Sequence, residues 1–538
     1  MVPSAASTDQ NAYPYDTERV RELLKHKRKV RGIRSCFPCR HRKDQIAALK
    51  ADLRASTRTA SPGSSPRPGV RTSKPPGRHF VEDATGATIF LGSHSDTPLA
   101  LGCRQAATPG DAMVDHFVPR AYPFTNLWGS GAAVKEVCET LPDDSDTIRY
   151  WQTYQSTAYP FYPVLVTIEQ FGASLFAFLD QRALAREATS RPEEPDSSWL
   201  ALLFAVLACG VQFSDDPIKE RDLRSKVFIC SSFQCLRLSN FFNRPDLDQI
   251  QAMALIGHCL RNNLDTNSAW ILMGATIRLA QSIGLHETSL SLPRAEQAQR
   301  NGLWWTLIWQ DTFLSFTYDR PPSAVTMMNC PIPYTHRGGH SFPECIFTIC
   351  DILLGRTRQE SSSTSTPLQR SLDCKRQLEA VWDSAAPFLT DKSHCASLQD
   401  HLERLALGVH LGYGICRLSH DVLLLGDEAS AADCMQSGLA AMESFLDLHR
   451  FSARVCRSWA FVHNAVSCAI TLRGLETRRG GRNSNPRAEA SVRRLIAVLE
   501  KEAKESEWCD ADTNVRHFGP YSRELKALRE IYLSENEV

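Results

Sequence analysis

Two cysteines, Cys36 and Cys39, are the first residues whose types and spacing could do chemistry. Thiolates two residues apart can occupy adjacent corners of a tetrahedral zinc site. Such a site takes four ligands, however, and the next cysteine along the chain is Cys103. His41 is close in sequence, but its spacing is poor for chelation by the same loop. On spacing alone, half of a zinc site and two incidental thiols in a basic arm are equally good interpretations.

The cysteine pair lies in the most basic part of the chain. Between Glu18 and Lys43, eleven Lys and Arg residues stand against two Glu residues, which gives a net charge of +9 over 26 residues. The rest of the chain has 50 basic and 58 acidic residues, so the whole-chain charge of +1 hides a basic arm on an acidic body. The run can be a solvated face, a nuclear-import signal or a phosphate-binding arm. The adjacent cysteine pair favours nucleic acid.

The stretch of residues 29–43, KVRGIRSCFPCRHRK, resembles the start of the fungal binuclear zinc-cluster DNA-binding domain. In that family six cysteines hold two zinc ions, and a short helix after the first cysteine pair enters the major groove. The resemblance implies that Cys36 and Cys39 are zinc ligands. It also implies base contacts just before the third cysteine position and phosphate contacts nearby. The expected DNA-binding residues are Arg34, Arg40, Arg42 and Lys43.

This sequence then departs from the family pattern. The third cysteine is expected after six intervening residues, but Ile46 stands there, and four of the six cysteines are missing. As spelled, the chain cannot build the two-zinc cluster. A deletion between Lys43 and Asp44, in the gene or in its intron assignment, is the simplest account.

Residues 44–53, DQIAALKADL, predict a short amphipathic helix. Ile46, Leu49 and Leu53 lie on one helical stripe, and the segment resembles the dimerising helix that follows the cluster in the family. The stripe spans little more than one heptad, whereas a coiled coil needs three or four. A homodimer would therefore need contacts from the rest of the chain.

Composition divides the remaining chain into two kinds of segment. Residues 1–17 are polar and predicted to be disordered, and residues 54–142 are predicted to be a mostly disordered linker, rich in Ser, Pro, Gly and Arg at its start. Residues 143–538 are predicted to form an all-helical domain. With 43% hydrophobic and 22% charged residues, no secretory signal and no apolar run of membrane-spanning length, the 18 cysteines are expected to be reduced thiols inside the cell.

The predicted fold class is all-α, because the helical domain shows no sustained alternation of apolar and polar residues. The segment 297–316 is apolar around most of its circumference and is expected to be a central, buried helix. The expected helices cover residues 199–213, 222–242, 247–263, 267–283, 297–316, 370–386, 398–424, 429–446, 455–474, 488–506 and 522–532.

A second resemblance covers the predicted helical domain to Val538. The matching blocks are AWILMGATIRLAQSIGLH at 269–286, RNGLWWTLIWQD at 300–311 and DRPPS at 319–323, with a weaker match at 459–464. In this order they resemble the regulatory domain of fungal-specific transcription factors. The resemblance implies an all-helical domain that is not an enzyme and that modulates activator output. The family usually has Gly before the Arg-Pro pair, where this chain has Asp319.

Asp311 lies within the apolar helix, and a buried carboxylate needs a partner. We expect a structural ion pair or hydrogen bond with Arg320 or Arg300 rather than a catalytic role. Histidines in apolar helical contexts are expected to be core residues with satisfied hydrogen bonds; these are His258, His286 and His463.

No enzyme signature is present: the sequence lacks a GxxxxGK(S/T) loop, a GxGxxG turn after a strand, a GxSxG elbow and HExxH. We therefore expect no catalytic residues and no enzyme activity. The resemblances imply a nuclear, DNA-binding transcription factor for RNA polymerase II genes, of a family that often serves single pathways such as secondary-metabolite clusters. Its implied partners are zinc, DNA, the transcription machinery or a regulatory protein, and a second copy of the chain, without a membrane. The alternative is a cluster-deficient modulator that does not read DNA and acts through partners of its helical domain.

Overall fold

The computed structural model describes the helical body and parts of the segment before it. All described residues lie in one unit that extends from Lys74 to Val538. They are residues 77–82, 88–95, 103–105, 124, 126–129, 131–187, 194–288, 292–324, 330–334, 338–362, 365–478, 485–506, 508–509, 516–517 and 520–532. The predicted basic arm, its cysteine pair and the 44–53 helix lie outside the described residues.

The first half of the body consists of helices built from the apolar runs of the sequence. They are α3 (Val134–Cys138), α4 (Asp144–Thr153), the π-helical turn η2 (Tyr154–Ala158), the 3₁₀ turn η3 (Tyr159–Phe161), α5 (Ile168–Glu187), α6 (Ser197–Phe213), α7 (Ile218–Leu238), α8 (Leu247–Asn262), α9 (Thr266–Ser282) and α10 (Arg294–Tyr318). In α6 the carboxylate of Asp196 accepts the Trp199 N–H, so Asp196 caps the start of the helix.

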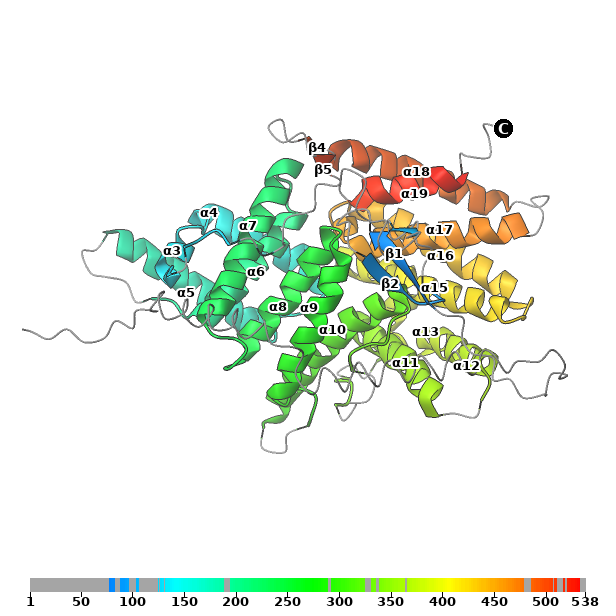
Figure 1. The fold of residues 1–538 in the computed structure, drawn as a ribbon, viewed down its shortest axis with the longest axis horizontal. Helices are drawn as coiled ribbons and strands as arrows, with labels where there is room; N and C mark the ends of the chain where they lie inside the picture. Colours follow the sequence, from blue (N-terminus) through cyan, green and yellow to red (C-terminus); the bar gives the residue numbers. More distant parts are fainter. Residues whose placement is uncertain are drawn as a thin grey trace, which may run out of the picture. The chain divides into compact units, whose positions relative to one another are not determined.

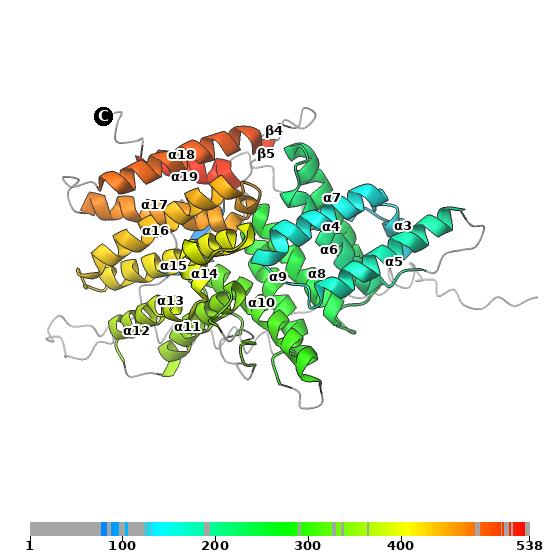
Figure 2. The ribbon, with the colours of Figure 1, turned by 180° about the vertical axis from the view of Figure 1, so that it is seen from behind.

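The second half adds helices that pack against each other and against α10. They are α11 (Phe342–Ser362), α12 (Pro367–Glu379), α13 (Val381–Ser384), α14 (Pro387–Thr390), η4 (Lys392–His394), α15 (Leu398–Leu424), α16 (Ser430–Phe451), η5 (Val455–Arg457), α17 (Trp459–Arg478), α18 (Pro486–Ser506) and α19 (Pro520–Tyr532). In both Figure 1 and Figure 2, α8–α10 lie between α3–α7 on one side and α11–α19 on the other.

The helix α10 is the buried helix predicted for 297–316. Trp304 and Trp305 are 0% and 2% exposed, and the helix packs against α9 and α11. The neighbouring helix α8 is buried along nearly its whole length, including polar residues in its last turn. The all-α prediction is therefore confirmed for the body. In the described part of the chain, no helix combines the length and the apolar character needed to cross a membrane.

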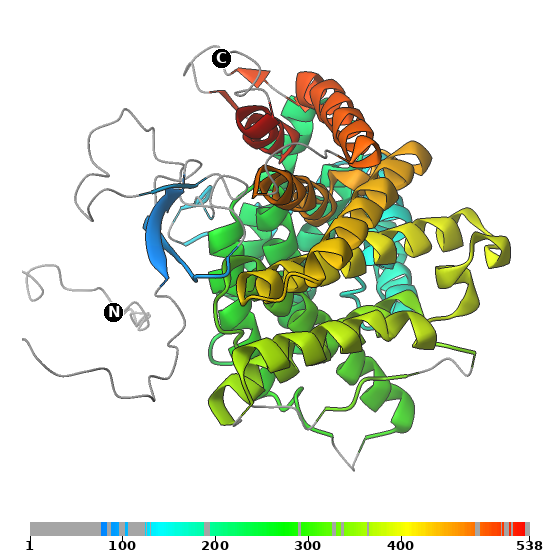
Figure 3. The ribbon, with the colours of Figure 1, turned by 90° about the vertical axis from the view of Figure 1, so that its right-hand side faces the viewer.

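Short strands precede the helices. The strands β1 (Arg78–Glu82), β2 (Thr88–Leu91) and β3 (Cys103–Gln105) form an antiparallel sheet in the order β2-β1-β3, with Arg78 opposite Leu91. A second pair joins β4 (Trp508–Cys509) to β5 (Arg516–His517). Figure 3 shows β1 and β2 along one side of the helical body. The strands β1–β3 and the helix α3 lie within residues 54–142, where we expected a linker, and β4 and β5 lie between two expected helices. Elements of two to five residues are too short to show a periodic pattern in the sequence.

Candidate functional site

The predicted site residues divide into two groups. The expected DNA-binding residues Arg34, Arg40, Arg42 and Lys43 and the expected zinc ligands Cys36 and Cys39 lie outside the described residues. Asp311 and Arg320 are described, and both lie near the C-terminal end of α10. Residues 88–95 dock at this end, so we call residues 88–95 and 311–323 with their partners the α10 junction.

A left-handed residue ends α10. Asp319 has φ of 48°, its N–H donates to Phe316 O at 3.3 Å, and the Arg320 N–H donates to Ser315 O at 2.9 Å. These two bonds form a Schellman motif, whose left-handed position usually holds glycine. This explains why glycine is expected before the Arg-Pro pair. Aspartate tolerates the left-handed conformation better than most residues, and here its side chain also has a hydrogen-bond partner.

The partner of Asp311 is not an arginine. Asp311 is 1% exposed, and its two carboxylate oxygens accept from the Ser323 N–H at 2.6 Å and from the Ser323 Oγ at 3.1 Å. The expectation of a buried and satisfied carboxylate agrees with this contact, but the expected partnership with Arg320 or Arg300 is replaced by Ser323. The turn after Pro322 brings Ser323 back over α10, a return that helical periodicity does not reveal.

Arg320 instead joins three segments of the chain. Its Nε donates to Phe90 O at 2.9 Å, and its Nη1 donates to Asn267 Oδ1 at 3.0 Å. The guanidinium lies over the rings of Trp270, at 4.6 Å, and Tyr318, at 4.4 Å. Arg320 therefore fastens β2 to the start of α9 and the end of α10. The donation to a backbone carbonyl of residue 90 links the segment before the body to the body itself.

The backbone of residues 92–94 completes the docking. The Gly92 N–H donates to Tyr318 O at 3.0 Å, and the His94 N–H donates to Asp319 Oδ2 at 2.9 Å. A Cβ at Gly92 would lie 2.2 Å from Asp319 O, so only glycine allows this approach. The side chain of Leu91 is 0% exposed beside the helices. The junction is thus a specific contact and not a loose crossing of two segments.

A charged cluster lies under the docked segment. The buried carboxylate of Asp421, on α15, is 3.1 Å from Arg356 Nη2, 3.4 Å from His94 Nδ1 and 3.9 Å from Arg417 Nε. Burial alone would raise the pKa of Asp421, but His94 and the two arginines outweigh it and lower the pKa below its ordinary value. Sequence reasoning missed all four residues, because they come from three distant segments and none belongs to a motif.

The junction holds residues 88–95 against α9, α10 and α15. Its polar groups form ion pairs, hydrogen bonds to backbone and hydrogen bonds between side chains. Among the residues that the structure describes, no group of three or more His, Cys, Asp or Glu side chains could hold a metal ion. A change in α9, α10 or α15 would act on residues 88–95 through Arg320 and Asp421.

Substitution of Gly92 tests the docking. We expect Gly92→Ala to place a methyl group against the backbone of Asp319 and to lower the free energy of unfolding by about 1–3 kcal/mol. Amide hydrogen exchange in residues 88–95 should accelerate while α17 keeps its protection. Gly129→Ala is the matched control, since no atom lies within 4 Å of a Cβ there. Unchanged exchange at 88–95 in Gly92→Ala would contradict the docking.

Substitution of Asp311 tests the buried carboxylate. Burial raises the pKa of Asp311 to about 6 despite the two hydrogen bonds from Ser323. Because folding raises this pKa, the carboxyl stabilises the fold below about pH 4, and this contribution is lost as the pH rises through 6. Asparagine can accept from the Ser323 N–H and donate to its Oγ without titrating. Relative to Asp311→Asn, the wild type should therefore lose about 2–3 kcal/mol of unfolding free energy between pH 4 and 7.

Chemical denaturation at a series of pH values measures this difference. Asp447→Asn, at a half-exposed surface carboxylate, is the control and should run parallel to the wild type. Parallel profiles for the wild type and Asp311→Asn would mean that the carboxyl is not perturbed by burial.

The sequence matches a known protein family and several known proteins. Residues 148–370 match the family model described as the fungal specific transcription factor domain. The chain is 28% identical over 148 residues to the thiamine repressible genes regulatory protein of Schizosaccharomyces pombe, covering 26% of this chain and 19% of that protein. It is 28% identical over 195 residues to the aurofusarin cluster transcription factor of Gibberella zeae, covering 34% and 27%.

A third relative is the ABC-transporter-regulating transcription factor of Aspergillus oryzae, which is 24% identical over 259 residues and matched over 45% of this chain and 28% of its own length. In each of these three comparisons the match spans less than a third of the relative. The similarity to these relatives therefore extends over only part of either protein.

Proposed function

From the premise that residues 148–370 of this chain are a fungal specific transcription factor domain, we propose that the protein regulates transcription. In this proposal the helical body sets the output, and the basic arm of residues 18–43 attaches the protein to DNA. The protein acts in the nucleus on genes transcribed by RNA polymerase II. Control of a single pathway is supported by relatives named for thiamine repressible genes and for the aurofusarin cluster.

The observation that carries the proposal is the family match of residues 148–370. The end of α10, within this matched region, also holds residues 88–95. Residues 88–95 follow the arm in sequence and dock at the end of α10 through Gly92 and Arg320. A conformational change of the body thus has a physical route toward the N-terminal part of the chain. No activity of the body toward a substrate is part of the proposal.

Zinc is the cofactor that the family resemblance implies, and the donor set does not fit a two-zinc cluster. Cys36 and Cys39 supply two thiolates where six are expected. The cysteines whose burial the structure describes cannot make up the number, because all of them except Cys138 and Cys395 are buried in the body. In this proposal the arm therefore attaches to DNA through its charge and not through a zinc cluster.

A second candidate function follows from the same deficit. With four of the six cysteines missing, the protein would bind DNA without reading sequence and would act as a modulator through partners of its helical body. Homodimers and regulatory proteins are the partners that both candidates share.

Zinc content and DNA binding of the full chain separate the two candidates. Near two zinc ions per chain, with one DNA sequence preferred over random DNA at physiological salt, supports the DNA-reading regulator. No bound zinc, with weak binding that disappears as salt increases and prefers no sequence, supports the modulator. Absence of both DNA binding and any effect on a reporter gene when the chain is recruited to a promoter would overturn transcriptional regulation itself.

A further inference from the structure

A small cavity lies in the core between α8, α10, α15 and α17. Its walls include Tyr162, His258, Arg261, Trp309, His410 and Phe461. The space that the centre of a water-sized sphere can reach is about 30 Å³, roughly enough for two ordered waters. The cavity adjoins the α10 junction, because Phe313, within residues 311–323, also lines its wall.

Arg261 is the unusual member of this wall. It lies in the last turn of α8, is 5% exposed, and has no carboxylate partner among the described residues. Its one hydrogen bond within the described chain joins Nη2 to His258 Nδ1 at 3.0 Å, while its Nε has no partner. Burial lowers the pKa of Arg261, as expected for a charge removed from water. A buried guanidinium without a counter-charge is costly, so a protein that retains one is expected to have a use for it.

Two histidines add further donors to the same wall. Since the arginine donates to Nδ1 of His258, the neutral ring carries its proton on Nε2, which has no partner in the described chain. Asn464 Nδ2 likewise donates to His410 Nδ1 at 3.1 Å, which leaves the His410 proton on Nε2. Burial, followed by the charge of Arg261, lowers the pKa of His410 to about 3. Both histidines are thus neutral donors beside a cation.

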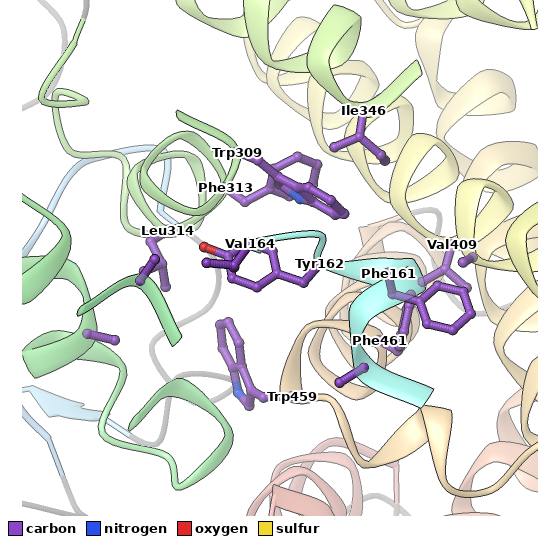
Figure 4. Packing of buried hydrophobic residues seen from close by; sticks show 14 of the residues in the cluster. Phe161, Tyr162, Val164, Trp309, Phe313, Leu314, Ile346, Val409, Trp459 and Phe461 are labelled. Atoms are coloured by element: carbon purple, nitrogen blue, oxygen red, sulfur yellow. The ribbon is translucent and has the colours of Figure 1, made fainter. Parts of the chain in front are cut away.

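Aromatic rings make up most of the remaining wall. Tyr162 stacks on His258 with centroids 4.9 Å apart, and His410 lies 5.1 Å from Phe461 and 6.1 Å from Trp309. Figure 4 shows Tyr162, Trp309, Phe313 and Phe461 converging from α10, from α17 and from the segment after η3. None of these side chains carries a negative charge. The cavity therefore combines unused donors and a positive charge with apolar, ring-shaped walls.

We propose that this cavity binds a short-chain carboxylate of about the size of formate or acetate. The carboxylate supplies the negative charge that Arg261 lacks and accepts from the guanidinium and from the imidazoles of both His258 and His410. Ordered water can accept the same hydrogen bonds but cannot neutralise the charge. The small volume excludes larger metabolites, and the ring walls suit the short apolar end of such an anion. Binding does not depend on the proposed transcriptional function, although regulation by this ligand would.

Formate is the probe for this proposal, with formamide as its neutral isostere. Saturation-transfer NMR on the full chain, with aromatic protons irradiated and ionic strength held by sodium gluconate, should show transfer to the formate proton. The thermal midpoint should rise with formate concentration. Formamide should give neither effect at the same concentrations. Equal effects of formate and formamide would show that the negative charge of the ligand plays no part in binding. If chloride displaced formate as well as unlabelled formate does, the cavity would bind anions in general and would not be selective for a carboxylate.

Variants locate the effect. Arg261→Gln should raise the dissociation constant for formate at least tenfold, whereas Arg278→Gln, at an exposed arginine on α9, should leave it unchanged. If Arg261→Gln does not fold, His410→Phe decides, because it keeps the ring and removes one donor. Formate binding at wild-type strength in a folded Arg261→Gln, or in His410→Phe when that variant decides, would overturn the site.

Discussion

Replacement of Asp421 by alanine is expected to lower the free energy of unfolding by about 3–5 kcal/mol. The reason lies in what the substitution leaves behind. The carboxylate is buried and faces His94, Arg356 and Arg417 at 3.1–3.9 Å. Removing this carboxylate takes a negative charge away from the largely buried guanidinium groups of Arg356 and Arg417. The expected loss therefore reflects the cost of burying these cations with less negative charge beside them, and not the net value of one ion pair.

The pH dependence of this loss has a definite sign. Because folding lowers the pKa of Asp421, its stabilising contribution is present above the unfolded value near pH 4 and is lost as the pH falls below it. The gap between the wild type and Asp421→Ala should be widest near neutral pH and should narrow in acid. Asp311 behaves in the opposite way, because burial without a cation raises its pKa.

Urea unfolding followed by far-UV circular dichroism measures the difference. Asp351→Ala is the matched control: Asp351 also pairs with an arginine, at 2.8 Å, but its side chain is 47% exposed, and exposed pairs contribute at most about 1 kcal/mol. A loss in Asp421→Ala no larger than in Asp351→Ala would show that the cluster does not stabilise the fold. Hydrogen exchange at 88–95 should also accelerate, since His94 loses its partner.

Features with a local periodic signal could be predicted from the sequence. The helix expected at 398–424 has the same bounds as α15, and Gly284 ends the expected 267–283 helix with φ of 71°. The burial of α10 follows from its apolar circumference. These features depend on residues within one or two helical turns of each other, so the spacing of apolar residues along the sequence predicts them.

Features that depend on contacts between distant segments could not be predicted. The helix α11 was not expected, although its start is marked by Ser341, whose N–H and Oγ both donate to Glu344 Oε2. The partner of Asp311 is set by the turn at Pro322, and the partners of Arg320 include a carbonyl more than two hundred residues away. Likewise, His258 was expected to be satisfied, but its Nε2 has no partner in the described chain.

Neutralising the basic arm is the second substitution with a large expected effect. We expect replacement of four residues by glutamine to weaken DNA binding and to flatten its salt dependence. Each phosphate contact contributes about 0.9 to the slope of log affinity against log salt, so the slope should fall by about 3 to 4. The four residues are Arg34, Arg40, Arg42 and Lys43.

A matched variant removes the same charge from the body instead of the arm. Its four arginines have side chains that are 66–75% exposed: Arg376, Arg450, Arg487 and Arg493. If charge position matters, only the arm variant should lose DNA affinity, as measured by fluorescence anisotropy on one duplex between low and physiological salt. Equal losses in both variants would mean that net charge alone attracts DNA.

The cysteine pair supplies the last distinction. Cys36→Ser with Cys39→Ser keeps the charge of the arm and removes both thiolates. If the arm binds as a charged segment, this double variant should bind with the wild-type salt slope, because phosphate contacts need no zinc. If it binds through metal, the variant should lose affinity and any sequence preference together, since a metal site that orders the arm also places its base-reading residues. The two outcomes separate a charged tether for the helical body from a reader of DNA sequence.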